Sequence, residues 1–231
     1  MDQETSITLN GNFDMHLEAL LLKHSLMKSL AIDTKLHFAI RDMQGMSGKK
    51  YRYLINNLIE ATNNARYLEV GSWAGSTACS AMYGNRVKVL CIDNWSEFGG
   101  PKETFLNNIG AVKPSGAIEF EFLESDFRQV DYKNIGKFNV YLFDGPHTEK
   151  DQYDGIHLAQ PALDDVFTFI VDDWNWEQVR WGTINALAST NIETICSIEI
   201  RTTHDNSHPV ICHQNSDWHN GYFIAVCKKK T

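Results

Sequence analysis

The sequence predicts an α/β fold, a three-layer sandwich in which helices cover both faces of a mostly parallel sheet. Short apolar runs alternate with amphipathic segments along the middle of the chain, as they do where helices connect parallel strands. The last two apolar runs have no helical segment between them, which indicates a C-terminal antiparallel hairpin. With 231 residues, 43% of them hydrophobic, the chain is long enough for one domain with a sizeable core.

The first 62 residues carry helical rather than strand patterns. We expect a loose lead-in over residues 1–13, helices over 15–30, 36–43 and 50–62, and a break at residues 45–48. One face of the first helix carries Leu17, Leu20, Leu21 and His24, and one face of the third carries Tyr51, Leu54, Ile55 and Leu58. We interpret residues 1–62 as a helical appendage, a lid or a dimer surface, of the same domain as residues 63–231.

Seven strands are expected in the remainder of the chain. They cover residues 67–70, 87–92, 118–123, 138–143, 166–171, 192–200 and 222–227. A helix begins near Gly75, and further helices are expected over residues 101–108, 149–163 and 176–189. The first five strands therefore belong to strand–helix units, and the last two form the hairpin.

Composition excludes several classes of protein. A net charge of −8 argues against general binding of nucleic acid or acidic membranes, because no basic field would attract phosphates. The five cysteines form no Cys-x-x-Cys pair, which is typical of reduced thiols in a cytoplasmic protein. The N-terminus is polar, and no apolar run approaches the ~20 residues that span a bilayer. We therefore expect no secretory signal and no membrane partner.

Residues 67–77, YLEVGSWAGST, form the stretch around which the chain is organised. The pattern indicates a strand ending near Glu69, a turn bracketed by Gly71 and Gly75, and a helix whose first N–H groups are free. Its Glu-x-Gly-x-x-x-Gly spacing fits neither the dinucleotide fingerprint nor the phosphate loop. An acidic residue before the turn also disfavours a phosphate and suits a ligand with hydroxyls and a cationic amine. The alternative is an ordinary strand–helix turn.

This stretch resembles motif I of class I S-adenosylmethionine-dependent methyltransferases, whose Rossmann-like sheet has seven strands. The resemblance implies S-adenosylmethionine as cofactor, with its amino-acid end near Glu69 and the turn. The turn residues concerned are Gly71, Ser72, Trp73, Gly75 and Ser76.

Acidic and polar residues also follow the next two strands. Asp93 ends the second strand, 22 residues beyond Gly71, where a carboxylate can accept hydrogen bonds from ribose hydroxyls. Asn94 and Trp95 continue this tip. The methyltransferase resemblance implies that the tip of the third strand contacts adenine through the segment Ser125, Asp126 and Phe127.

Three carboxylates are expected to converge at the ends of the fourth and fifth strands. Asp144 ends the fourth, and Asp172 and Asp173 end the fifth; neighbouring strand tips lie about 5 Å apart. Such carboxylates repel one another unless a cation joins them, and Mg²⁺ prefers carboxylate oxygens. His147, at the same rim, is a candidate general base. The alternatives are helix caps and surface acids for the aspartates and a solvated loop residue for His147.

The segment from Asp144 to Glu149, DGPHTE, followed by Asp172, Asp173 and Trp174, extends the resemblance. It is similar to metal-dependent small-molecule O-methyltransferases, including the methyltransferase domain 24-like family, over about residues 65–190. Pro146 departs from that family, which often has a further Asp there. The resemblance implies that Asp144 contacts the cofactor as well as the metal, and that Asp144 and His147 are catalytic.

Two further groups of residues have less specific patterns. Trp174, Trp176 and Trp181 follow the carboxylates and either clamp a ring or pack on the sheet. His204, His208, His213 and His219 occur at intervals of 4, 5 and 6 residues, which match no usual zinc signature. We interpret this histidine-rich segment as a loop beside the site.

The sequence therefore predicts a cytoplasmic enzyme that transfers a methyl group from S-adenosylmethionine to a hydroxyl of a small molecule, with Mg²⁺. A homodimer through the N-terminal helices is expected, and no nucleic acid. The alternatives are a nicotinamide-dependent oxidoreductase on a similar sheet and an inactive S-adenosylmethionine-binding protein. The sequence does not identify the acceptor.

Overall fold

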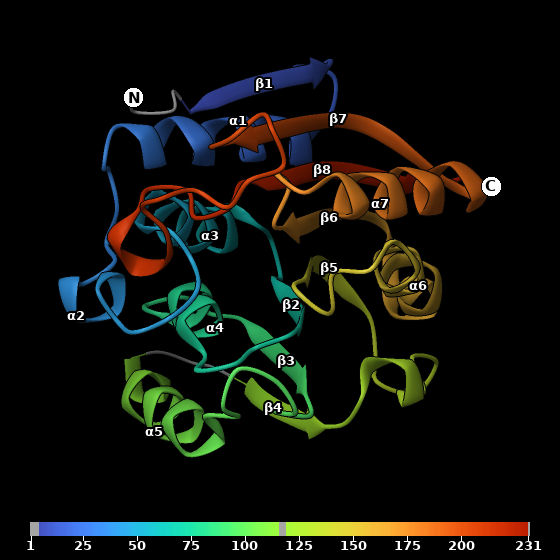
Figure 1. The fold of residues 1–231 in the computed structure, drawn as a ribbon. Coiled ribbons are helices and arrows are strands. Elements are labelled where there is room, and N and C mark those ends of the chain that lie inside the picture. The colour runs from blue at the N-terminus through green and yellow to red at the C-terminus, as the bar shows by residue number, and fades with distance from the viewer. Residues whose placement is uncertain (1–4, 116–118, 231) are drawn as a thin grey trace.

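The computed structural model describes residues 5–115 and 119–230 and contains one eight-stranded sheet (Figure 1). Its strand order is β1-β7-β8-β6-β5-β2-β3-β4. Strands β2 to β6 are parallel, whereas β8 is antiparallel to β6 and β7, and β1 is antiparallel to β7. The strands are β1 (Ser6–Gly11), β2 (Arg66–Val70), β3 (Lys88–Asp93), β4 (Glu119–Glu124), β5 (Phe138–Phe143), β6 (Leu163–Asp172), β7 (Ile192–Arg201) and β8 (Tyr222–Lys229).

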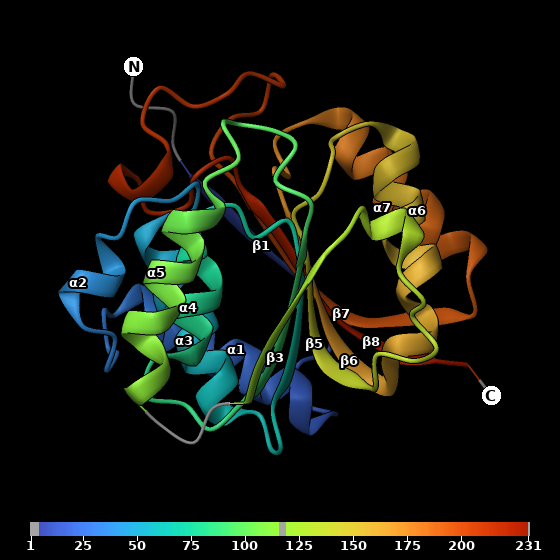
Figure 2. The same cartoon turned by 90° about the horizontal axis from the view of Figure 1, so that it is seen from below.

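Helices cover both faces of the sheet (Figure 2). Helices α1 to α5 lie on one face, and α6 and α7 lie on the other. The helices are α1 (Leu17–Leu30), α2 (Phe38–Arg41), α3 (Lys49–Ala61), α4 (Ser76–Met82), α5 (Lys102–Val112), α6 (Glu149–Ala159) and α7 (Glu177–Ser189). The prediction of a three-layer α/β fold with a C-terminal antiparallel hairpin is confirmed.

The sheet has one strand more than the sequence predicted. All seven expected strands are present, although Ile118, the expected first residue of the third, lies outside the described residues. The lead-in prediction for residues 1–13 was wrong, because Ser6–Gly11 pairs with β7, Ser6 opposite Arg201 and Gly11 opposite Cys196. A short edge strand whose partner lies about 190 residues away has no local signal that distinguishes it from a polar loop.

The N-terminal helices are packed into the domain. Helix α3 is buried over Tyr51–Ile59, which includes the predicted face. In α1 the buried face contains Ala19, Leu22 and Leu26, whereas Leu17 and Leu20, on the predicted stripe, are exposed. Apolar residues occur on several sides of α1, so periodicity alone could not select the inner face.

The strand order places a switch point between β2 and β5. From β2 the chain proceeds outwards through β3 and β4, then returns to β5 on the other side of β2. The carboxyl ends of parallel strands open a crevice where the order reverses, and ligands bind there in open α/β sheets.

No helix of the described residues has the length and apolar character that a membrane crossing requires. All five cysteines are free thiols.

Candidate active site

A cavity of about 670 Å³ lies at the carboxyl ends of β2 to β6. Its lining comes mainly from the ends of these strands and the segments that follow them, with Met46 from the N-terminal segment and residues of the loop between β7 and β8. The predicted site residues on its wall are Gly71, Trp73, Asp93, Asn94, Ser125, Asp126, Phe127, Asp144, His147, Asp172 and Asp173. The structure therefore brings most of the predicted site residues together around one cavity.

The turn between β2 and α4 requires glycine at two positions. Gly71 has a φ of 84°, and a Cβ at this residue would lie 1.8 Å from the backbone oxygen of Asp144. Gly75, the N-cap of α4, has a φ of 81°. Gly71 thus supplies both a left-handed backbone and the close approach of the turn to the end of β5.

Asp93 holds this turn against the end of β3. Its carboxylate accepts hydrogen bonds from the backbone N–H groups of Ser72 and Trp73, at 2.8 and 2.7 Å, and of Trp95, at 2.6 Å. The residue is only partly buried and lines the cavity. Asp93 therefore organises the predicted cofactor turn in addition to facing the predicted ribose position.

Glu69 lies beneath the turn, and it is absent from the cavity lining. Its side chain is fully buried, and Oε2 accepts a hydrogen bond from the Tyr67 hydroxyl at 2.6 Å. Burial raises the pKa of Glu69 to about 7, against the lowering effect of the hydrogen bond from Tyr67. This position does not give Glu69 the predicted direct contact with the cofactor, and it fits a role in ordering the turn.

Three other predicted cofactor residues lie beside the main cavity. Ser72 and Ser76 line a small pocket next to it, together with Met46 from the N-terminal segment. Trp95 packs against Phe105, with ring centroids 5.2 Å apart, and its Nε1 donates to the Trp73 carbonyl at 2.9 Å. These residues support the turn from behind.

The tip of β4 forms the opposite wall. Phe127 packs edge-on against Phe143, with ring centroids 5.1 Å apart, and still lines the cavity. Asp126 pairs with Arg128 at 2.8 Å, and Arg128 also pairs with Asp151. The wall thus offers an apolar ring beside polar groups, the combination expected for the adenine position.

The predicted carboxylates meet at the ends of β5 and β6. The pairing of Phe143 with Val171 places Asp144 level with Asp172. Carboxylate oxygens of Asp144 and Asp173 and a ring nitrogen of His147 lie within 4.8 Å of one another. His147 Nε2 is 2.6 Å from Asp173 Oδ2, and Asn220 donates to Asp173 Oδ1 at 2.7 Å.

Burial and mutual repulsion separate the pKa values of these groups. Burial and the neighbouring negative charges raise the pKa of Asp144 and of Asp172 well above their usual range. Burial also acts to raise the pKa of Asp173, but the adjacent His147 ring outweighs it and lowers that pKa. Burial acts to lower the pKa of His147, and its interaction with Asp173 reverses the direction and raises it.

The cavity is strongly acidic. Its described lining includes Asp93, Glu97, Asp126, Asp144, Asp151, Asp172 and Asp173. Among the lysine and arginine residues of the described chain, Arg128 alone joins this lining, and it pairs with Asp126 and Asp151. The three carboxylates at β5 and β6 therefore have no lysine or arginine partner within this lining, which is the electrostatic setting that a cation would relieve.

Tertiary structure shows which of the less specific candidates reach the site, and it adds Met46 and Phe98, which no sequence pattern indicated. Met46, Phe98 and Trp176 line the cavity, as do His208, His213 and His219. Of the three tryptophans considered, Trp174 is buried against Phe223 and Trp181 is exposed, so Trp176 alone faces the cavity. The histidine-rich loop does lie beside the site, as predicted.

Comparisons with known proteins relate the chain to others by fold. No protein-family model matches it, and no curated protein sequence matches it. TomG, an O-methyltransferase from Streptomyces achromogenes solved in complex with SAM, aligns over 91% of this chain and 90% of its own, with 11% identity and a TM-score of 0.51. PH1948 from Pyrococcus horikoshii, a candidate RNA methyltransferase, aligns over 89% and 98%, with 12% identity and a TM-score of 0.54.

A third solved structure, TrmN from Thermus thermophilus, aligns over 78% of this chain with 14% identity and a TM-score of 0.52. The chain spans 48%, about half, of the length of TrmN. These identities are too low to transfer an activity. The structural alignments show that the chain has the fold of class I S-adenosylmethionine-dependent methyltransferases.

Proposed function

We propose that the protein is an S-adenosylmethionine-dependent methyltransferase that methylates a hydroxyl of a small molecule, assisted by a divalent metal such as Mg²⁺. The observation that carries this proposal is the acidic cavity at the switch point, where the turn at Gly71 lies beside Asp144 and His147. The class I methyltransferase fold supports the same reaction type.

The residues around the cavity fit S-adenosylmethionine. The turn from Gly71 to Trp73 would receive its amino-acid end, Asp93 and Asn94 its ribose, and Ser125 to Phe127 its adenine. When bound, S-adenosylmethionine supplies an electrophilic methyl group on a positively charged sulfur. The acidic lining favours such a cation and disfavours the pyrophosphate of a nicotinamide cofactor, which makes the oxidoreductase the weaker alternative.

Asp144, Asp172 and Asp173 would hold the metal. Their oxygens suit a hard cation such as Mg²⁺, which would offset their mutual repulsion and promote ionisation of an acceptor hydroxyl. Asp144 belongs to both the metal group and the cofactor turn through its contact with Gly71. The chain would thus place acceptor and methyl donor in near-attack geometry, the main source of acceleration for this kind of transfer.

In this proposal His147 receives the acceptor proton. The Asp173 carboxylate lies 2.6 Å from Nε2 of His147, so its negative charge favours a proton on that nitrogen of the neutral ring and leaves Nδ1 to accept one. Trp176 packs edge-on against the imidazole, with ring centroids 5.0 Å apart, and restricts its rotation. Asp173 and Trp176 therefore position His147, which acts as the general base.

Small-molecule acceptors fit the charge of the chain better than RNA does. PH1948 raises RNA as an alternative, but a net charge of −8 and an acidic cavity would repel a phosphate backbone. TomG supports the O-methyltransferase interpretation.

Calorimetry with S-adenosylmethionine, with and without Mg²⁺, followed by a screen of hydroxylated acceptors, tests the proposal. Asp93→Ala should weaken cofactor affinity about tenfold or more, because charge-assisted hydrogen bonds worth roughly 1.5–3 kcal/mol are lost. Asp144→Asn and Asp172→Asn should reduce turnover far more than cofactor affinity, with the surface variant Asp131→Asn as control.

Three outcomes would overturn parts of the proposal. Absence of S-adenosylmethionine binding would reject the cofactor. Full turnover in excess chelator would reject the metal. Binding without turnover on any acceptor class, and without metal dependence, would favour the inactive binding protein.

A further inference from the structure

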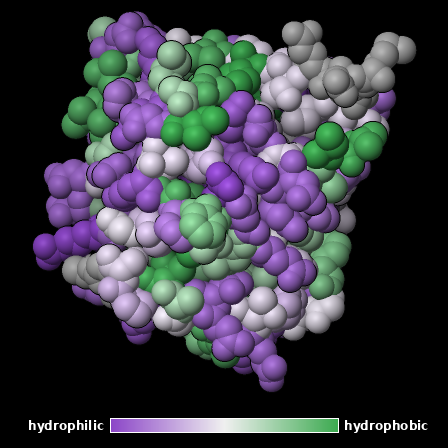
Figure 3. All heavy atoms as spheres, turned by 90° about the vertical axis from the view of Figure 1, so that its left-hand side faces the viewer, coloured by the Kyte–Doolittle hydropathy of each residue, from purple (hydrophilic) through white to green (hydrophobic). Residues whose placement is uncertain are grey.

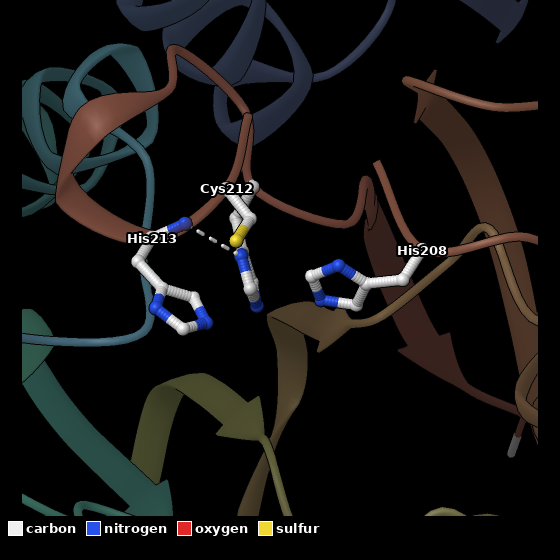
Figure 4. A group of neighbouring side chains, drawn as sticks. His208, Cys212 and His213 are labelled. Carbon is white, nitrogen blue, oxygen red and sulfur yellow. Dashed lines mark hydrogen bonds between the residues drawn. The ribbon is translucent and has the colours of Figure 1, made fainter. Parts of the chain in front are cut away.

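A second group of metal-ligating side chains lies on the cavity wall, in the loop between β7 and β8. His208, Cys212 and His213 point toward a common space (Figure 4). Each offers one donor atom, and these atoms lie within 4.8 Å of one another and of a ring nitrogen of His219. His208 is exposed, and Cys212 and His213 are partly buried, so an ion can reach them. His208 and His213 also line the cavity.

The backbone of the loop is bent so that two consecutive side chains face the same way. Cys212 is extended, with φ −138° and ψ −176°, a conformation after which the next side chain normally points to the opposite side. His213 instead has a φ of 57°, in the left-handed region that non-glycine residues enter at a cost. This bend brings the His213 ring beside the Cys212 sulfur (Figure 4).

Hydrogen bonds determine which ring nitrogen carries the proton in His208 and in His219. His208 Nδ1 lies 3.1 Å from the Pro209 carbonyl, which can only accept, so Nδ1 carries the proton and Nε2 has a free lone pair. His219 Nδ1 accepts the backbone N–H of His213 at 3.0 Å, which places its own proton on Nε2, 3.7 Å from Asp173. His219 therefore supports the loop, while His208 is available as a ligand.

The protonation of the other donors is compatible with metal binding. Burial and the neighbouring His208 lower the pKa of His213, so its ring is neutral at neutral pH. Burial lowers the pKa of His219 to about 4. The Cys212 thiol, whose pKa burial raises, would release its proton to solvent as a sulfur–metal bond forms.

We infer that His208, Cys212 and His213 form a zinc site whose fourth coordination position opens to the cavity. Three protein ligands of nitrogen and sulfur with one open position are typical of zinc sites that bind a water or a substrate atom. In a tetrahedral site, zinc–ligand distances of about 2.0–2.3 Å place the ligands roughly 3.3–3.7 Å apart. The three donor atoms, which lie within 4.8 Å of one another, would reach that separation by a shift of about 1 Å.

This site differs from the proposed magnesium site in its chemistry. Asp144, Asp172 and Asp173 offer only oxygen, which suits a hard cation, whereas the loop offers one thiolate and two imidazoles, which suit zinc or cobalt. The inference goes beyond the proposed function, because it depends only on the loop and does not require methyl transfer.

Cobalt titration of the full, chelator-treated chain tests the site. Co²⁺ should bind with a thiolate-to-cobalt charge-transfer band and the intense visible bands of four-coordinate Co²⁺, and Zn²⁺ should displace it. Cys212→Ser should abolish the charge-transfer band. His208→Ala and His213→Ala should each weaken Co²⁺ binding by at least about tenfold to a hundredfold, since removal of supporting partners alone has effects of that size.

Matched variants locate the metal. His204→Ala removes a histidine of the same segment that hydrogen-bonds to Ser6 instead, and it should leave the titration unchanged. Asp172→Asn should also leave the charge-transfer band unchanged. A band that survives Cys212→Ser, or that is lost in Asp172→Asn while far-ultraviolet circular dichroism shows an intact fold, would overturn the site. Added azide should shift the visible bands, and an unchanged spectrum would contradict the open position.

Discussion

At the scale of single residues, the buried carboxyl of Glu69 makes the stability of the fold depend on pH. Its pKa is about 7 in the folded chain because burial disfavours its charge, whereas the ordinary value is 4.5. Below pH 4.5 the group is protonated in both folded and unfolded chains, so its burial does not lower the free energy of unfolding. As pH rises from 4.5 through 7, the unfolded chain ionises first and stability is lost.

Glu69→Gln should remove this loss. Each unit of pKa shift corresponds to 1.36 kcal/mol, so the variant should gain roughly 3 kcal/mol in free energy of unfolding relative to the wild type between pH 4.5 and 8. Urea denaturation at a series of pH values measures this difference. Glu103→Gln, on the exposed side of α5, is the control. A difference between Glu69→Gln and wild type that stays constant over this range would contradict the buried-carboxyl explanation.

His147 is the second residue whose role can be measured directly. Loss of a general base lowers turnover about 10²–10⁴-fold, so His147→Ala should show such a fall once an acceptor is known, with little change in cofactor affinity. Added imidazole should restore part of the rate, because it replaces the missing proton acceptor. His157→Ala, at the end of α6 and stacked on Tyr153, should retain normal turnover. Near-normal turnover in His147→Ala would mean that another group removes the proton.

At the scale of secondary-structure elements, the close approach of the β2–α4 turn to the end of β5 couples two parts of the site. A side chain at Gly71 would collide with the backbone oxygen of Asp144. At Gly136, which has a similar φ of 96°, no atom lies within 4 Å of an added Cβ. Replacement by alanine would strain the backbone at both glycines, because both have a positive φ. Only at Gly71 would the added methyl group also collide with another part of the chain.

Gly71→Ala should consequently be about 1–3 kcal/mol more destabilising than Gly136→Ala, which is the usual cost of overpacking. It should also weaken S-adenosylmethionine binding, because the turn moves away from Asp144. Thermal unfolding and calorimetry of both variants measure these effects. Equal losses in the two variants would show that backbone strain, and not contact with β5, accounts for the need for glycine.

The N-terminal elements also reach the site. Arg52 is fully buried, and its Nη1 donates to the carbonyls of Arg41 and Met43 at 2.9 and 2.6 Å. Its Nε donates to the Ser47 hydroxyl at 2.9 Å. This network fixes the segment that places Met46 at the cavity. A lid role for residues 1–62 stays a prediction.

At the scale of the whole molecule, the outer surface of α1 carries unpartnered apolar side chains. Leu17 is 63%, Leu20 42% and Met27 59% exposed, and their spacing places them on one stripe of α1. In the view from the left-hand side of Figure 1, hydrophobic residues gather in the upper part of that face, among hydrophilic ones (Figure 3). A dimer through α1 remains a prediction that follows from this surface.

Light scattering coupled to size exclusion should show a dimer. Because a charge in the centre of an apolar contact is costly to bury, the double variant Leu20→Glu and Met27→Glu should be monomeric with unchanged helix content. Ile184→Glu, on the exposed side of α7, should remain dimeric. A wild-type chain that is monomeric at every concentration would reject the interface.

The sequence by itself determined the fold class and which strand ends form the cavity wall. Hydrophobic periodicity and the glycine spacing at residues 71 and 75 are local properties, so they located the strands, the turn and the acidic strand tips. Because parallel strands end at one edge, the order of the elements was enough to predict that Asp144, Asp172 and Asp173 would converge.

Only the tertiary structure decided the contributions that depend on distant pairing. The partner of β1 lies near residue 200, and the inner face of α1 depends on its contact with α3, so neither is visible in a local window. The histidine-rich loop has no zinc spacing along the chain, and the left-handed bend at His213 creates the His208, Cys212 and His213 group in space. Backbone bends and long-range contacts leave no periodic pattern in the sequence. For this reason the pairing of β1, the inner face of α1 and the histidine–cysteine group could be found only in the tertiary structure.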